Sequence, residues 1–203
     1  MNLKEAYNRI AEDWYRDHHQ DDWWIEGTDK FISLLKPGAN ILDVGCGAGV
    51  KSNYLIQKGL PVTGIDLSEK MIELAKKHVP NGIFYVQDLY QLANLEKTFD
   101  GVFAQAVLLH IPKNRISEVM KLLAAKIKPG GYLYVAVKER RPSEPEEEIV
   151  KENDYGYPYE RFFSYFTKEE MEKKFQELNL QICYISTKNP GQRNWIQVIG
   201  RKD

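Results

Sequence analysis

Short apolar runs alternate with helix-like stretches from about residue 39 to residue 137. Most of the runs end near glycine or aspartate, and the stretches between them carry apolar residues every three or four positions. Because strands that alternate with helices build βαβ units, we expect a parallel sheet with helices on both faces. The pattern predicts strands over residues 41–44, 62–65, 83–86, 101–105 and 132–137.

The stretches between the strands predict helices with recognisable ends. One helix covers residues 50–58 and stops at Gly59. A second begins after Ser68, a residue type that commonly caps a helix N-terminus. A third covers residues 113–128, where the apolar spacing is helical, and the Pro-Gly-Gly sequence at 129–131 ends it.

The C-terminal part has a different pattern of apolar and polar residues. Thr167 and Glu170 form a capping-box pattern ahead of a helix. Two β-like runs follow, over 181–186 and 195–199, and the turn at 189–191 between them predicts an antiparallel hairpin. The expected fold class is therefore α/β, with a three-layer, Rossmann-like, doubly wound sheet of seven strands. We expect this sheet to be mostly parallel and to finish in an antiparallel C-terminal edge hairpin.

Two segments lie outside this plan. Residues 1–36 predict one or two helices with an apolar stripe that includes Tyr7 and Trp14. Residues 139–166 form a long connection rich in tyrosine and phenylalanine, and a connection of this length is usually a functional lid or a disordered segment. Because the chain has no internal repeat and no low-complexity linker, we treat residues 1–203 as a single domain.

The composition is that of a soluble globular protein, with 43% hydrophobic and 28% charged residues. Lysine plus arginine (28) nearly balances aspartate plus glutamate (29), so a nucleic-acid partner is not expected. The two cysteines have no paired spacing, which argues against disulfides and a cysteine zinc site, and no metal site is predicted. No apolar run reaches the roughly 20 residues that span a bilayer, so we expect a cytoplasmic protein with no membrane partner.

The segment after the first strand carries the most informative chemistry. Asp43 precedes Gly45, Gly47 and Gly49 at the carboxyl end of a strand, where open α/β sheets bind their ligands. Glycine is needed there because a Cβ would keep the backbone away from a ligand. The dinucleotide fingerprint would require one more glycine where Val50 stands, which argues against a nicotinamide-dependent oxidoreductase.

The later strands end in further residues of this kind. Asp66 lies about 20 residues beyond the glycine loop, where a carboxylate can accept hydrogen bonds from both ribose hydroxyls. Asp88 ends the third strand, Gln105 ends the fourth, and a Lys-Pro-Gly-Gly-Tyr turn at 128–132 leads into the fifth. In this order the segments resemble the motifs of class I S-adenosylmethionine-dependent methyltransferases, in particular small domains of the type 11/25 kind.

The resemblance implies S-adenosyl-L-methionine as the methyl donor and S-adenosyl-L-homocysteine as the product. It places the ribose at Asp66, the adenine amino group near Asp88 and the methionine moiety at Gln105. The cofactor-binding residues that it implies are Asp43, Gly45, Cys46, Gly47, Asp66, Leu67, Met71, Asp88, Leu89 and Gln105.

Several of these residues have a second, structural interpretation. Asp43 either touches the donor or holds the glycine loop by accepting backbone N–H groups. Asp66 could cap the next helix, Asp88 could be a turn residue, and Met71 could belong to the core. Cys46 is interpreted as a small residue tolerated in a tight loop, not as a nucleophile, because no motif places a base beside it.

The sequence identifies no general base. His110 follows the fourth strand, close to the expected position of the reactive methyl group. It either acts as a base or only ends its segment before Pro112. His18 and His19 are adjacent and cannot share one helical face, so they are expected to be solvated.

The expected function is methyl transfer to a small molecule by in-line displacement, with positioning as the main catalytic effect. Residues 1–36 would form a helical lid and 139–166 an insertion on the acceptor side. The aromatic side chains predicted to line the acceptor pocket are Tyr7, Trp14, Tyr157 and Tyr159.

Other interpretations stay open at this point. The aromatic residues could instead pack the helices onto the sheet. The acceptor could be a tRNA or another nucleic acid, which would require a local basic face. The chain could also be a catalytically silent, donor-binding regulatory protein. The sequence predicts neither the methylated atom nor the oligomeric state.

Overall fold

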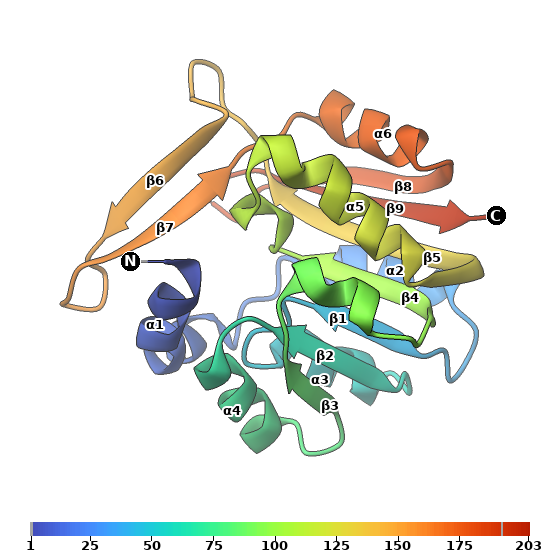
Figure 1. The fold of residues 1–203 in the computed structure, drawn as a ribbon, viewed down its shortest axis with the longest axis horizontal. Helices are drawn as coiled ribbons and strands as arrows, with labels where there is room; N and C mark the ends of the chain where they lie inside the picture. The colour runs from blue at the N-terminus through green and yellow to red at the C-terminus, as the bar shows by residue number, and fades with distance from the viewer. Residues whose placement is uncertain (1, 192) are drawn as a thin grey trace.

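The computed structural model describes residues 2–191 and 193–203. Its centre is a seven-stranded sheet in the order β3-β2-β1-β4-β5-β9-β8 (Figure 1). Strands β1 to β5 pair in parallel, whereas β9 pairs antiparallel with both β5 and β8. The predicted fold class is therefore confirmed. The strands of this sheet are β1 Ile41–Val44, β2 Val62–Asp66, β3 Ile83–Val86, β4 Phe99–Gln105, β5 Ile127–Lys138, β8 Leu180–Lys188 and β9 Trp195–Lys202.

Helices cover both faces of the sheet (Figure 1). Helices α2 and α3 pack on one face, and α5 and α6 pack on the other. The α-helices are α1 Leu3–His18, α2 Ile25–Leu34, α3 Val50–Gln57, α4 Glu69–His78, α5 Ile116–Ala125 and α6 Lys168–Glu177. Short 3₁₀ helices are η1 Leu89–Asn94, η2 Leu108–His110 and η3 Lys113–Arg115.

The predicted helix caps are confirmed. The Ser68 hydroxyl accepts a hydrogen bond from the backbone N–H of Met71, at 3.1 Å. Thr167 and Glu170 form a complete capping box, because each side chain accepts from the other residue's backbone N–H. These caps satisfy backbone donors that have no partner inside the helix.

The connection into the fifth strand differs from the prediction. The helix expected over 113–128 begins as η3 and ends at Ala125, and β5 starts at Ile127, ahead of the Pro-Gly-Gly sequence. The reason is early pairing with β4, in which Ile127 lies opposite Phe99. The pairing register then shifts between Phe99 and Gly101, because residues 129–131 of β5 have no paired partner in β4. The Pro-Gly-Gly sequence predicted to end a helix therefore lies within an irregular part of β5.

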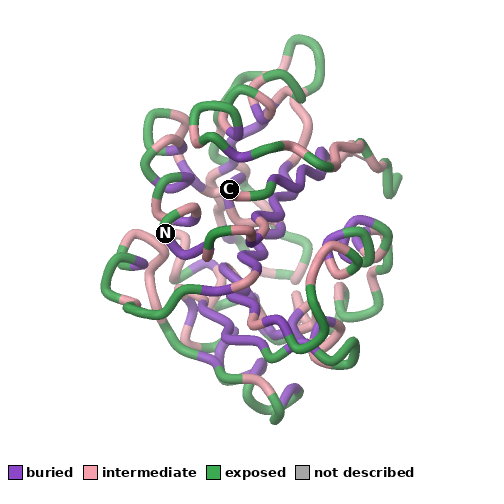
Figure 2. Tube along the Cα trace, turned by 90° about the vertical axis from the view of Figure 1, so that its right-hand side faces the viewer, coloured by how far each residue is buried: buried purple, intermediate pink, exposed green. Residues whose placement is uncertain are grey.

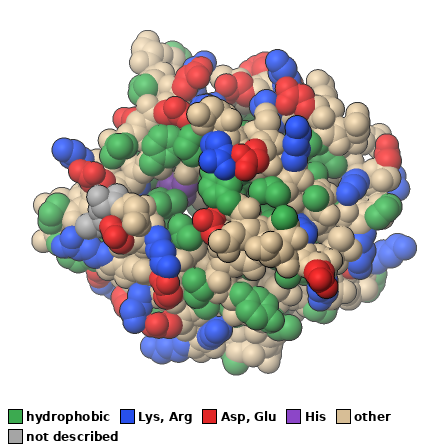
Figure 3. Space-filling view, viewed as in Figure 1, with side chains coloured by type: hydrophobic (Ala, Val, Ile, Leu, Met, Phe, Trp, Pro, Cys, Tyr) green, Lys and Arg blue, Asp and Glu red, His purple; other side chains and the backbone are tan. Residues whose placement is uncertain are grey.

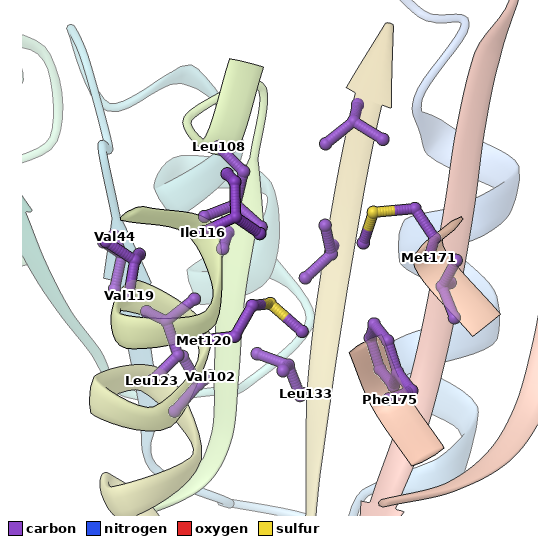
Figure 4. Packing of buried hydrophobic residues seen from close by; sticks show 14 of the residues in the cluster. Val44, Val102, Leu108, Ile116, Val119, Met120, Leu123, Leu133, Met171 and Phe175 are labelled. Carbon is purple, nitrogen blue, oxygen red and sulfur yellow. The ribbon is translucent and has the colours of Figure 1, made fainter. Parts of the chain in front are cut away.

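The main core lies between the sheet and helices α5 and α6 (Figure 4). Val119, Met120 and Leu123 of α5 point to the sheet, where Val102 and Leu133 meet them (Figure 4). Figure 2 shows the same arrangement along the chain, with buried segments through the centre and exposed segments on the outer turns. This close-packed layer fixes the strand ends that carry the candidate site.

A two-stranded hairpin, β6 Glu147–Glu152 with β7 Tyr159–Ser164, lies apart from the central sheet (Figure 1). It occupies the connection for which a lid or a disordered segment was expected. Its first strand, Glu-Glu-Ile-Val-Lys-Glu, has no apolar alternation, so hydrophobic periodicity did not reveal it. The second strand supplies the buried side chains, including Tyr159 and Phe163, and the part-buried pair of Arg161 with Glu152 joins the two strands.

The N-terminal helices have different positions. Helix α1 lies between α4 and β7, whereas α2 packs on the sheet through Phe31, which is fully buried against Phe103 and Tyr134. Within residues 1–36, only α1 is therefore placed like a lid. No helix in the described residues is long and apolar enough to cross a membrane.

Replacing Leu123 with alanine tests the role of this core. Leu123 is fully buried, and removing its side chain should lower the free energy of unfolding by about 2–5 kcal/mol. Ile149→Ala is the matched control because Ile149 is 64% exposed on the hairpin, and its change should stay below about 1 kcal/mol. Urea unfolding of both variants measures this, and equal losses would contradict the assignment of the core.

Candidate functional site

The carboxyl ends of the parallel strands open into a cavity of about 1440 Å³, bordered on the other side by α1 and β7. Figure 3 shows a hollow between these elements, with hydrophobic side chains and a histidine beside it. Every residue predicted to bind the cofactor lines this cavity, namely Asp43, Gly45, Cys46, Gly47, Asp66, Leu67, Met71, Asp88, Leu89 and Gln105. The structure thus brings the separate sequence motifs to one place.

The glycine loop after β1 depends on backbone conformations that favour glycine. Gly45 has φ +68°, and a Cβ on it would lie 2.7 Å from the side chain of Val107. Gly47 has φ +52°, and the nearest neighbour to a Cβ there would be the Trp14 ring at 3.9 Å. A side chain at Gly47 would therefore enter the space in front of the loop, which glycine leaves open to a ligand.

Asp66, at the end of β2, holds this loop. One carboxylate oxygen accepts from the Gly47 N–H at 2.9 Å, and the other accepts from the Ser68 N–H at 2.9 Å. Burial raises the pKa of Asp66, and these backbone donors oppose the rise. Each oxygen keeps a second lone pair for a ligand hydroxyl, so the capping and ligand-binding interpretations of Asp66 are compatible.

Asp43 has a separate role inside the loop. It is 2% exposed and accepts a hydrogen bond from the Ser52 hydroxyl at 2.6 Å. Burial raises the pKa of this carboxyl to about 7, although Ser52 and Lys51 favour its charged form. The Gly47 N–H donates to Asp66 and not to Asp43. Asp43 instead accepts from Ser52 and so contacts helix α3.

Gln105 presents a buried donor at the end of β4. The side chain is 6% exposed and lines the cavity, and its oxygen accepts a long hydrogen bond from Tyr134. Its Nε2 has no hydrogen-bond partner among the residues that the structure describes. An unsatisfied buried donor costs about 1–3 kcal/mol, so a ligand that accepts from it would recover this energy.

Asp88 and Met71 show that a structural role does not exclude a place at the cavity. Asp88 caps η1 by accepting from the Tyr90 N–H at 2.9 Å. Met71 is 1% exposed and packs in a cluster with Trp14. Both residues also line the cavity. Cys46 lines it as well, but burial raises the pKa of its thiol well above the usual range, so it has little thiolate character.

A hydrogen-bonded chain lies beyond the end of β4. The His110 Nδ1–H donates to the Phe162 carbonyl at 2.8 Å, which leaves Nε2 without a proton. Nε2 therefore accepts from the Tyr7 hydroxyl at 2.7 Å, and Arg161 donates to the same hydroxyl at 3.3 Å. Burial, with help from the nearby cations Arg161 and Lys138, lowers the pKa of His110 to about 3. The imidazole is therefore neutral near pH 7.

The aromatic residues predicted for the acceptor side divide into two groups. Tyr7 and Trp14 line the cavity, whereas Tyr157 and Tyr159 do not. Tyr157 instead attaches the hairpin turn to α1, donating to Asp13 at 2.6 Å. His18, expected to be solvated, lines the cavity and stacks on Trp14 with ring centroids 4.7 Å apart.

Three lysines that were not predicted line the cavity, namely Lys4, Lys51 and Lys138. Lys51 follows the glycine loop, and its ammonium lies 5.6 Å from the Trp14 ring centroid. Lys138 ends β5, and its ammonium lies 3.9 Å from the Phe163 ring centroid. The available signal for Lys138 was its place directly after a predicted strand, at the edge where ligands bind. In the described residues, no group of three or more His, Cys, Asp or Glu side chains could hold a metal.

A Rossmann-like sheet with a glycine loop at β1 and a carboxylate at the end of β2 defines an α/β protein that binds a nucleoside-containing cofactor. A family model described as a methyltransferase domain, type 23, matches residues 16–185. The chain therefore belongs to the methyltransferase domain family. This confirms the class that the motifs resembled, although the matching model is type 23 rather than 11 or 25.

The chain is similar to ubiquinone biosynthesis O-methyltransferases. The one from Coxiella burnetii (strain Dugway 5J108-111) is 34% identical over 143 residues, which are 62% of this chain and 60% of that protein. The one from Xylella fastidiosa (strain 9a5c) is 31% identical over 166 residues, which are 68% of this chain and 65% of that protein. The chain thus spans less than two thirds of the length of these relatives.

Solved structures share the fold over nearly the whole chain. The 1,6-didemethyltoxoflavin-N1-methyltransferase of Burkholderia thailandensis, with 1,6-didemethyltoxoflavin and S-adenosylhomocysteine bound, has a TM-score of 0.77 and 18% identity over 98% of this chain and 87% of that one. The magnesium protoporphyrin IX methyltransferase of Synechocystis PCC 6803, with S-adenosylhomocysteine bound, has a TM-score of 0.75 and 19% identity over 99% of this chain and 98% of that one.

The raised pKa of Asp43 predicts a pH-dependent stability. Folding raises this pKa from 3.8 to about 7, so the stability that Asp43 contributes is present below pH 3.8 and lost as pH rises through about 7. Asp43→Asn, which can still accept from Ser52, should gain stability relative to the wild type between pH 4 and 8. The gain should reach at most about 4 kcal/mol. Urea unfolding across that range measures it, and a constant difference would contradict the shift.

His110 should show one neutral tautomer over a wide pH range. Nitrogen-15 NMR of labelled protein should find its proton on Nδ1 from pH 5 to pH 8, because burial lowers its pKa to about 3. His19, which is exposed, provides the comparison in the same spectra. A His110 titration with a midpoint near the usual value of about 6.5 would show that the imidazole is not buried as described.

Proposed function

We propose that this protein transfers the methyl group of S-adenosylmethionine to a small-molecule acceptor. The main support for the proposal is that residues from four strand ends line one cavity. These residues were predicted from sequence motifs alone. The unsatisfied Nε2 of Gln105 in that cavity supports a ligand there. The ubiquinone biosynthesis O-methyltransferases, by their name, act on a small molecule, which supports the same class of acceptor.

The residues present fit this donor. Asp66 keeps lone pairs for the ribose hydroxyls, and Asp88 lies at the neighbouring strand end for the adenine amino group. Gln105 would meet the methionine moiety with its free N–H. Lys51, whose ammonium lies near the Trp14 and Trp24 rings and forms no ion pair with a described residue, would neutralise the carboxylate of that moiety.

When bound, S-adenosylmethionine supplies a methyl group already activated as an electrophile on a sulfonium. The protein has to align the acceptor, exclude water and accept a proton where the acceptor must lose one. Tyr7 and His110 suit the first task, because both line the cavity and the Tyr7 hydroxyl is held in place by donating to His110 Nε2. With a pKa of about 3, His110 is a weak base near pH 7, so this pair would orient the acceptor by hydrogen bonding and would not hold its proton.

Features of the cavity support a small acceptor over a nucleic acid. The bordering elements α1 and β7 restrict access, and Tyr157 ties them together. The insertion carries a run of glutamates at 146–148, which would repel a phosphate backbone. A small, partly aromatic acceptor could pass between α1 and β7 and has no phosphate backbone for the glutamates to repel.

Asp66→Asn tests the cofactor assignment. Losing the carboxylate should weaken binding of S-adenosylhomocysteine by about tenfold to a hundredfold, because charge-assisted hydrogen bonds to the ribose and to the loop are lost. Isothermal titration calorimetry of the wild type and the variant measures this, with NAD as the competing ligand that should not bind.

The matched control for this titration is Glu73→Gln, which changes an exposed carboxylate on α4 and should leave the affinity unchanged. Failure of the wild type to bind S-adenosylhomocysteine, or equal affinity in Asp66→Asn, would reject the donor. Once binding is established, a screen with methyl-labelled donor identifies acceptors, and turnover would exclude a catalytically silent protein.

A further inference from the structure

The lysine and arginine side chains that line the cavity differ in their partners. In the described residues these cations are Lys4, Lys51, Lys138, Arg141, Arg161 and Arg193. Lys4 pairs with Glu69, Arg161 with Glu152, and Arg141 and Arg193 share Glu144. Lys51 and Lys138 have no ion pair or hydrogen bond with any residue that the structure describes, and aromatic rings lie against both. Lys51 also has the carboxylates of Asp21 and Asp43 near enough to favour its charged form.

The two lysines lie on different sides of β4. Lys51 lies in the first turn of α3 beside the glycine loop, on the side of the residues assigned to the donor. Lys138 ends β5, which lies beyond β4 in the sheet order β3-β2-β1-β4-β5. If the donor's carboxylate is neutralised at Lys51, the charge at Lys138 is left for the second substrate.

The surroundings of Lys138 carry an excess of positive charge. Arg161 is held by two contacts to Glu152, at 2.5 and 2.6 Å, and Arg193 by two contacts to Glu144, both 2.8 Å. The cations Lys138, Arg141, Arg161 and Arg193 line the cavity, whereas no glutamate among the described residues lines it. Burial, Arg161 and Arg193 lower the pKa of Lys138 to about 8, although Glu152 and Glu148 oppose them. An anion beside Lys138 would relieve this repulsion.

Flat rings complete this end of the cavity. The Phe163 ring lies against Lys138 and 5.0 Å from the His110 ring, and Trp23 and Trp195 lie with ring centroids 4.5 Å apart. All of these side chains line the cavity, together with Tyr7. Aromatic walls of this kind favour a ring by stacking or edge contacts.

We propose, on the basis of the proposed function, that Lys138 binds a carboxylate on the methyl acceptor and that the acceptor is a small aromatic acid. The carboxylate would lie against the Lys138 ammonium and the ring against Phe163. The group to be methylated would then lie beside Tyr7 and His110, because the Phe163 ring lies against both Lys138 and His110. Lys138 is thereby a specificity residue that selects anionic over neutral acceptors.

The test compares two probes of the same shape and different charge. With S-adenosylhomocysteine at saturation, the protein is titrated calorimetrically with 4-hydroxybenzoate and with the neutral 4-hydroxybenzamide. The wild type should bind the acid about tenfold to a hundredfold more tightly, which is the effect of a charge-assisted contact. Lys138→Met should bind both probes equally, and Lys138→Arg should keep the preference for the acid.

The matched control is Lys151→Met, which removes the same charge from the nearby hairpin, where its side chain is 83% exposed. It should keep the preference for the acid. Equal binding of acid and amide by the wild type, binding of neither, or an unchanged preference in Lys138→Met would overturn the assignment. Each variant is first titrated with S-adenosylhomocysteine, so a failed donor site in the wild type is recognised separately from a failed acceptor anchor.

Discussion

The carboxylate of Asp66 is the contact on which the candidate site depends. By accepting from Gly47 and Ser68, it joins the glycine loop after β1 to the start of α4 after β2. The loop can take this path because Gly45 and Gly47 adopt positive φ, and the space that side chains would fill stays open. The free lone pairs of Asp66 and the unsatisfied donor of Gln105 then face a single cavity.

The cavity is completed by parts of the chain that are not part of the sheet. Helix α1 contributes Tyr7, and the hairpin contributes Arg161, which meets the same hydroxyl. Tyr157 links the hairpin turn back to α1, so the two additions support each other. The acceptor side is therefore built from polar and aromatic contacts between distant segments, whereas the donor side is built from strand ends that the core holds in place.

This division explains what the sequence could predict. The donor side follows from local rules, such as the spacing of Asp43 and the loop glycines, so all of its predicted residues meet at the cavity. The hairpin could not be predicted, because its first strand has no apolar alternation and its pairing depends on contacts across the turn, such as Glu152 with Arg161. The path of the hairpin over α1 also explains why Tyr157 binds Asp13 and does not line the predicted pocket. Lys138 differs, because its place at the end of a predicted strand could be read from the sequence.

A crystal structure of the protein with S-adenosylhomocysteine tests the central claim most directly. We expect the ligand in the cavity at the strand ends, with a ribose hydroxyl on Asp66 and a ligand oxygen accepting from Gln105 Nε2. A complex in which the ligand lies elsewhere, or in which neither Asp66 nor Gln105 touches it, would contradict the account.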